Sequence, residues 1–397
     1  MPPVSLPTVR YASGMAGSVA NGNPFRPGAG QMPPFLAGRE EDLQLAANRL
    51  ADLAGGIPPA QGLLFFGPRG NGKTVLLERV REEARRRGMR AERLGAGAFR
   101  SEERLVRELR RRAGVEGGPV TGVQIASVGV TAERGTPSED HVELFAEWVR
   151  ADSAPLVVLL DEAHSLASDA ARDFFEAAQI AGSEELPFVL VAAGTPDAPR
   201  ALRRAGTFTE RMLERRRLGR LDQAAAAAAL ARPAERGGLP MDDDALALLV
   251  RESQRYPYFI QLLGSAAWDA AGRTSERRIS RNAAKQGIAA AHSKIQVFYQ
   301  ERFAEAREQG VHAALRPLAE RMTGGEGRIG DADLDRLLEE GAAIRGGLDD
   351  PGTIRISLQN LGVIWEVSSG IWEMGIPSFA EHVLQRARDG RTVYSLW

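Results

Sequence analysis

The chain has 397 residues, of which 43% are hydrophobic and 26% charged, and its formal net charge is -1. This length allows two or three domains with separate cores, and the balanced charge gives no general attraction to nucleic acid. The absence of cysteine excludes disulfides, thiolate metal sites and cysteine nucleophiles. No apolar run reaches the roughly 18 residues of a membrane span and no signal peptide pattern begins the chain, so we expect a cytoplasmic protein that does not enter a membrane.

Residues 1–34 are rich in proline, glycine and serine and lack apolar periodicity, which predicts a mostly disordered arm. A helical pattern of leucines follows over residues 43–53. From residue 35 to residue 221 we expect an α/β core with a parallel sheet, because short apolar strands alternate with helical segments such as 168–180. The expected strands cover residues 63–66, 90–94, 156–160, 188–193 and 216–218, and alternating apolar residues at 120–131 predict a small inserted β-hairpin.

Beyond the core the pattern becomes helical. Residues 222–294 are predicted to form a helical lid, with helices near 245–249 and 259–268. Residues 295–397 continue with helices and end in two apolar strands, 364–367 and 371–374, joined by a Ser-Ser-Gly turn. Helices closed by a hairpin indicate a winged-helix domain.

A glycine-rich loop follows the first predicted strand and leads directly into a helix. Its residues match the pattern G-x-x-x-x-G-K-[ST] in full: Gly67, Pro68, Arg69, Gly70, Asn71, Gly72, Lys73 and Thr74. Such a loop turns backbone N–H groups toward phosphates, and the helix N-terminus adds positive charge. We therefore expect the loop to bind ATP, with Lys73 on the β and γ phosphates and Thr74 on Mg²⁺.

A second motif begins where the strand at 156–160 ends. Asp161 and Glu162 follow this strand directly, which is the Walker B arrangement. Asp161 is predicted to hold Mg²⁺ with Thr74, and Glu162 to polarise the attacking water. Thr195 follows the strand at 188–193 and is expected at the same sheet edge. It would sense the γ-phosphate or the water, or simply cap the next helix.

In this order of motifs the chain resembles the AAA+ ATPases, within them the origin-recognition-like and STAND-like branch. The resemblance extends from about residue 23 to the C-terminus and rests on residues 35–39, the two Walker motifs, Thr195, residues 208–211 and residues 256–261. It implies an α/β core, a helical lid and a C-terminal winged helix, with ATP hydrolysed to ADP and phosphate at a site that uses Mg²⁺.

The resemblance also implies roles for single residues. The backbone of residues 36–39 would frame the adenine, and Pro257 would start the lid helix beside the nucleotide. Arg211 stands where relatives place an arginine that acts on a neighbouring subunit's site. Because other arginines crowd around it, a simple solvent-exposed role for Arg211 is nearly as well supported. Relatives carry glycine where this chain has Arg255. Relatives of the initiator type also have a phosphate-sensing arginine early in the lid helix, but this chain has Tyr258 there, so no such arginine is assigned. We expect His164 to be a solvated or capping residue.

The charge of the predicted winged helix bears on its partner. Residues 295–397 contain 11 arginines and no lysine against 16 acidic residues, a net charge of -5. Because phosphate neutralisation supplies most non-specific affinity, this domain is expected to bind DNA weakly. Its candidate recognition helix offers only Arg355 among basic residues. Protein contact or autoinhibitory docking is the better prediction for it.

Three functions agree with these patterns. The first is an ATP-hydrolysing switch that assembles into a homo-oligomer and acts on DNA, for which the arginines at 104–112 could provide a groove. The second is a STAND-like signalling or defence switch with a protein partner. The third is a scaffold that binds ATP without turnover, which the presence of Glu162 disfavours.

Overall fold

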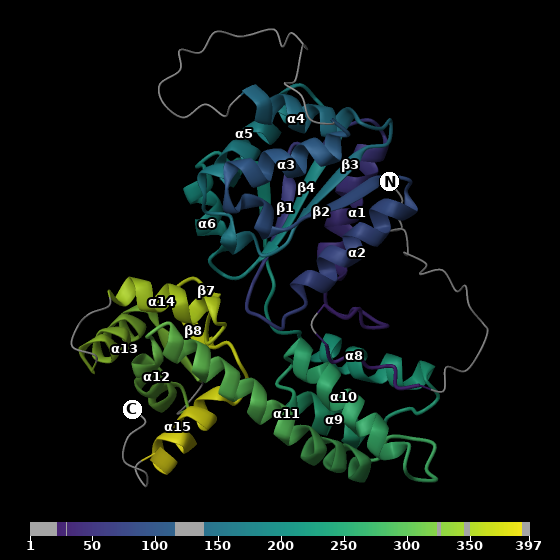
Figure 1. The fold of residues 1–397 in the computed structure, drawn as a ribbon. Helices are drawn as coiled ribbons and strands as arrows, with labels where there is room; N and C mark the ends of the chain where they lie inside the picture. Colours follow the sequence, from purple (N-terminus) through teal and green to yellow (C-terminus); the bar gives the residue numbers. More distant parts are fainter. Residues whose placement is uncertain (1–21, 29, 116–138, 324–326, 345–349, 391–397) are drawn as a thin grey trace, which may run out of the picture.

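The computed structural model describes residues 22–28, 30–115, 139–323, 327–344 and 350–390. Three parts are visible in Figure 1: an α/β core, a helical lid below it and a C-terminal module beside the lid. The hairpin predicted at residues 120–131 lies outside the described residues. No described helix combines the length and the apolar content that crossing a membrane requires.

The core is built on a parallel sheet of five strands in the order β2-β3-β4-β1-β5. The strands are β1 (Gly62–Phe66), β2 (Arg90–Leu94), β3 (Leu156–Leu160), β4 (Phe188–Gly194) and β5 (Leu213–Arg217). All five predicted strands are present, but β5 begins three residues earlier than expected. It is an edge strand with alternating burial: Arg215 and Arg217 are exposed, Arg216 is half-buried, and the only fully buried residue is Leu213.

Helices cover both faces of this sheet, as a parallel sheet requires. Along β3, Leu156, Val158 and Leu160 pack toward one face and Val157 and Leu159 toward the other. The second face carries α1 (Glu40–Ala54) and α2 (Lys73–Arg86). The first carries α3 (Glu102–Ala113), α4 (Glu139–Arg150), α5 (Asp169–Ser183) and α6 (Ala198–Ala205), with the short helices η1 (Ala96–Arg100), η2 (Ala163–Ser165) and α7 (Thr209–Met212) in the loops.

Four helices follow the core: α8 (Gln223–Arg236), α9 (Asp243–Glu252), α10 (Pro257–Ala271) and α11 (Arg281–Glu308). The first three and the start of α11 form the lid. Helix α11 continues through the boundary predicted at residues 294 and 295 and runs from the lid to the C-terminal module (Figure 1).

The C-terminal module comprises η3 (His312–Ala314), α12 (Leu315–Met322), β6 (Arg328–Gly330), α13 (Asp331–Ile344), α14 (Pro351–Asn360), β7 (Ile364–Ser368), β8 (Ile371–Met374) and α15 (Phe379–Gly390). Its three strands form an antiparallel sheet in the order β6-β8-β7. The hairpin of β7 and β8 lies where the sequence predicted it. This arrangement of helices and sheet is consistent with a winged helix.

The N-terminal segment from residue 22 to residue 34 differs from the predicted disordered arm, because its described residues lie against the lid. Phe25 is only 2% exposed and packs beside Gly264, where even a Cβ atom would lie 2.6 Å from the ring. The amide of Asn23 donates to Ser265 and Asp269. The ring of Phe25 against Gly264 thus anchors this short segment, although its sequence has no apolar periodicity.

Replacing Phe25 with alanine should destabilise the lid. Truncation of a buried phenylalanine costs about 3 kcal/mol or more in free energy of unfolding, because the cavity left behind is only partly filled. The matched control is Ile57→Ala, since Ile57 is 67% exposed and its truncation should change the free energy by less than about 0.5 kcal/mol. Urea denaturation followed by circular dichroism measures both. Equal effects of the two substitutions would show that the segment is not anchored through Phe25.

Candidate functional site

Strands β1, β3 and β4 end at one edge of the sheet and bring three distant loops together there. They pair in parallel and in register, with Phe66 opposite Gly194 and Leu160 opposite Ala192. The loop after β1 is tied to the end of β4, because the amide of Gly67 donates to the carbonyl of Gly194 at 3.2 Å. The glycine-rich loop, Glu162 and Thr195 therefore meet at this edge.

The conformation of the glycine-rich loop requires its glycines. Gly70 and Gly72 have φ values of 79° and 83°, in the left-handed region, and α2 begins at the next residue, Lys73. A Cβ atom on Gly70 would lie 2.4 Å from the hydroxyl oxygen of Tyr256. That hydroxyl, which is fully buried, donates a hydrogen bond to the carbonyl of Arg69. Tyr256, a residue of the lid, thus supports the glycine-rich loop at Arg69 and Gly70.

Lys73 is folded back into the loop. Its ammonium donates to the carbonyl of Pro68 at 2.8 Å. Burial lowers the pKa of Lys73 to about 8, although Glu162 and Asp161 act in the opposite direction. A half-buried ammonium with one hydrogen bond is short of acceptors and of negative charge. A phosphate supplies both.

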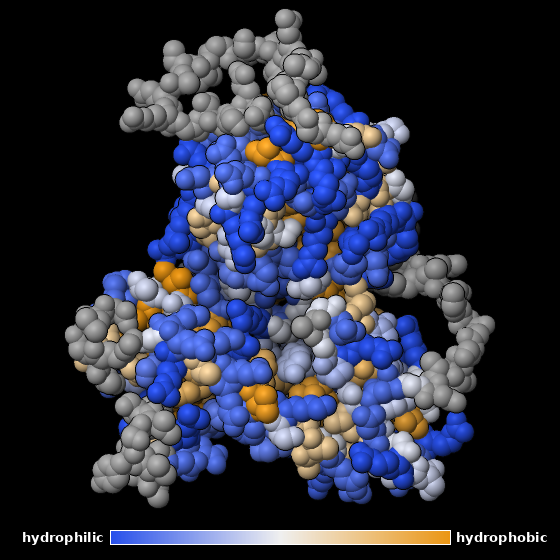
Figure 2. Space-filling model, viewed as in Figure 1, coloured by the Kyte–Doolittle hydropathy of each residue, from blue (hydrophilic) through white to orange (hydrophobic). Residues whose placement is uncertain are grey.

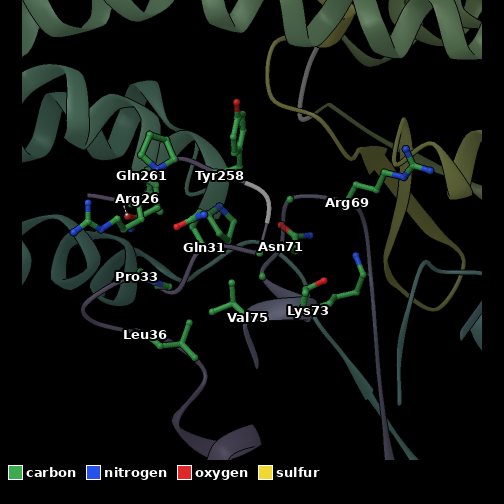
Figure 3. Close-up of a pocket in the computed structure, with 18 of the residues that line it drawn as sticks. Arg26, Gln31, Pro33, Leu36, Arg69, Asn71, Lys73, Val75, Tyr258 and Gln261 are labelled. Carbon is green, nitrogen blue, oxygen red and sulfur yellow. Dashed lines mark hydrogen bonds between the residues drawn. The ribbon is translucent and has the colours of Figure 1, made fainter. Parts of the chain in front are cut away.

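A cavity of about 680 Å³ opens between the core and the lid beside this loop. Figure 3 shows Lys73, Asn71 and Arg69 at one end of it, and Leu36, Pro33, Arg26 and Gln261 toward the other. Its lining includes most of the predicted site residues, namely Arg69, Gly70, Asn71, Gly72, Lys73, Thr74, Glu162, Thr195 and Pro257. Gly67, Pro68, Asp161 and Arg211 do not line the cavity. The size suits a nucleotide.

Asp161 and Glu162 differ in their surroundings. Asp161 is 6% exposed and forms an ion pair with Arg93 from the neighbouring strand. Glu162 is turned out into the cavity by a left-handed backbone, with φ of 56°, which is rare for a residue other than glycine. Its side chain is 60% exposed and free to contact a water. Such strain at a site residue is a common sign of function.

His164 is neither solvated nor a helix cap, contrary to the prediction. Its side chain is 18% exposed, with Nε2 at 3.3 Å from a carboxylate oxygen of Glu162. Its Nδ1 accepts from the amide of Thr195 at 3.5 Å. Burial lowers the pKa of His164, which keeps the ring neutral so that Nδ1 can accept. The histidine thus joins the ends of β3 and β4.

Thr195 is covered by the C-terminal module. It is 2% exposed, and its hydroxyl donates to the amide oxygen of Asn360, at the end of α14, at 3.0 Å. The turn after α14 also reaches the glycine-rich loop, since a Cβ atom on Gly362 would lie 3.4 Å from the amide nitrogen of Arg69. Nothing in the local sequence of Asn360 or Gly362 signals these contacts.

The remaining predicted residues are spread over several elements. Residues 36 and 37 line the cavity as expected, and Arg39 is buried with a hydrogen bond of 2.6 Å to the carbonyl of Gly219. The N-terminal segment adds a wall that the sequence did not predict, through Arg26, Gly28 and Gln31 among others. Arg211 is exposed on α7, away from the cavity of its own chain.

Comparison with known proteins agrees with this geometry. Residues 59–202 match the family model of an AAA domain. The ORC2 protein of Aeropyrum pernix, in its ADPNP–ADP complexes, superposes with a TM-score of 0.55 at 16% identity, covering 90% of this chain and 97% of that chain. A Walker-type ATPase of Pyrococcus abyssi gives a TM-score of 0.55 at 14% identity, with 88% and 96% covered. No curated protein sequence matches the chain.

Residues 59–202 therefore match an AAA domain, and the chain shares its fold with the ORC2 protein and the Walker-type ATPase. This confirms the predicted resemblance and fold class. The site combines groups suited to binding phosphates: a glycine-rich loop at a helix N-terminus, a half-buried lysine and a carboxylate facing the cavity.

The pKa of Lys73 predicts how nucleotide binding depends on pH. A bound triphosphate stabilises the charged amine and raises its pKa above 8, so binding takes up a proton. Affinity should be constant below this pKa and fall as the pH rises through it, by up to about tenfold per pH unit. Calorimetric titrations with ATP at about pH 7 and about pH 9 measure the change. In Lys73→Arg the guanidinium stays charged, so any residual binding should lose this dependence; a wild-type affinity equal at both pH values would contradict the assignment.

Proposed function

We propose that the protein is a nucleotide-dependent switch that binds ATP between core and lid, hydrolyses it to ADP and phosphate, and signals its state through the C-terminal module. The AAA domain and the cavity support ATP binding. In this proposal Lys73 and the loop amides hold the phosphates, residues 36–39 frame the adenine, and Pro257 closes the site from the lid. Glu162 positions the water that attacks the terminal phosphate.

Mg²⁺ is expected with the nucleotide, and the residues fit it in part. Thr74 lines the cavity, and Asp161 directly follows strand β3. Hydroxyl and carboxylate oxygens are the ligands that Mg²⁺ prefers. The ion neutralises charge on the phosphates when bound. Arg93 holds Asp161 in a defined position, from which it would contact the ion directly or through water.

The observation that carries the switch is the contact between Thr195 and Asn360. Thr195 stands where the γ-phosphate or the lytic water would be sensed, yet its hydroxyl is committed to the C-terminal module. Further contacts hold the module to the core: Arg217 donates to the carbonyl of Glu366 at 2.8 Å and stacks on Trp365 at 5.4 Å. A ligand that takes over the hydroxyl of Thr195 weakens this docking, so nucleotide state and module position are linked.

A protein partner is favoured over DNA for the C-terminal module. Arg355, the one basic residue of α14, forms ion pairs with Asp335 and Asp331 of the same module. Asn360 on the same helix is occupied by the core. A recognition helix needs such groups free for phosphates and bases. We propose further that the chain assembles into a homo-oligomer in the cytoplasm, where the exposed Arg211 would serve a neighbour's site.

Substitution of Glu162 by glutamine tests the proposed enzyme. The amide cannot accept the proton of the attacking water, so hydrolysis should fall at least about a hundredfold while ATP binding is retained. Phosphate release and equilibrium binding of a fluorescent ATP measure the two properties. Glu185→Gln is the matched control, because Glu185 also has a left-handed backbone but lies on the exposed surface. Wild-type protein that binds ATP without releasing phosphate would instead favour the non-hydrolysing scaffold.

A further inference from the structure

One carboxylate oxygen holds two arginines at the phosphate end of the cavity. Oε2 of Glu305 lies 2.7 Å from Nη1 of Arg302 and 3.4 Å from Nη1 of Arg69. Arg302 and Glu305 belong to α11, whereas Arg69 belongs to the glycine-rich loop. Both arginines line the cavity. The ion pairs therefore connect the loop that receives phosphate with the helix that joins the lid to the C-terminal module.

Arg302 has more hydrogen-bonding capacity than its surroundings use. Its side chain is 12% exposed, and its Nε has no hydrogen-bond partner within the described part of the chain. The guanidinium lies 5.4 Å from the centre of the Phe298 ring, which fixes its plane. A guanidinium presents five N–H donors in a rigid fork that matches phosphate oxygens, and a buried donor without an acceptor is costly. An anion in the cavity would satisfy it.

We propose that Arg302 is a further phosphate-binding residue, which contacts the terminal phosphate of ATP, and that Glu305 holds Arg302 and Arg69 until the nucleotide replaces it. This inference rests on the proposed ATP binding. The terminal phosphate is assigned because Lys73, which reaches the β and γ phosphates in such loops, bonds to Pro68, the neighbour of Arg69. The arginines thus stand at the γ end.

The location of Arg302 on α11 would link its contact with the terminal phosphate to the C-terminal module. The start of the lid helix α10 carries Tyr258 and offers no arginine to the phosphates. Arg302 approaches instead from α11, two turns before this helix ends near the C-terminal module. A γ-phosphate that draws Arg302 away from Glu305 would act on α11, while the same phosphate competes for Thr195. Both contacts respond to ATP and not to ADP.

Titrations of fluorescent mant-ATP and mant-ADP test the assignment on the full chain. Arg302→Ala should weaken mant-ATP about tenfold, the scale of one charge-assisted hydrogen bond, with mant-ADP changed little. Arg302→Lys, which keeps the charge but not the fork, should fall between. Glu305→Gln should tighten mant-ATP several-fold, because it releases both arginines. Arg307→Ala, an exposed arginine of the same helix, is the control and should change neither affinity.

The two substituted positions predict opposite changes, so misfolding cannot imitate the result. The assignment is overturned if wild-type protein binds both nucleotides but Arg302→Ala and Glu305→Gln leave the ratio of ATP to ADP affinity unchanged. Wild-type protein that binds neither nucleotide would instead refute the proposed function itself. A loss of both nucleotides in Arg302→Ala, without rescue by lysine, would reduce Arg302 to a packing residue.

Discussion

The parallel pairing of β1, β3 and β4 is the constraint on which the site depends. Parallel strands end at a common edge of the sheet. The glycine-rich loop therefore meets Glu162, about ninety positions later, and Thr195, about thirty positions after that. The register places Phe66 opposite Gly194 and Leu160 opposite Ala192. The glycine-rich loop, Glu162 and Thr195 then have one relative position, and the bond from Gly67 to Gly194 holds it.

The same edge is where the lid and the C-terminal module meet the core. The hydroxyl of Tyr256 supports the loop from the lid, Asn360 binds Thr195 from the module, and Glu305 binds Arg69 from the helix between them. These contacts surround the space that the terminal phosphate would take. Each contact is polar, and an anion or its water could replace it. In the proposed switch, the binding energy of one small group would therefore change the contacts between the domains.

Much of the core was predictable because its signals are local. The three apolar strands β1, β3 and β4, the loop motif and the Asp161-Glu162 pair each lie within a few residues, and the hairpin of β7 and β8 is marked by its own turn. The contacts of Phe25, Arg302 and Asn360 depend on segments far apart in sequence, with no periodicity to mark them. His164 was misjudged for this reason: its partners, Glu162 and Thr195, surround it only after the sheet has formed. Arg93 beside Asp161 is likewise a consequence of strand order.

In the proposed switch, ATP loosens the C-terminal module from the core. Because the chain has no cysteine, spin labels can be attached at two introduced ones, Arg204→Cys on α6 and Glu340→Cys on α13, both exposed. Double electron–electron resonance on the Glu162→Gln protein then gives the distance between them. We predict one narrow distance without nucleotide or with ADP, and a longer, broader distribution with ATP and Mg²⁺. Identical distributions in all three states, in protein shown to bind ATP, would contradict the account.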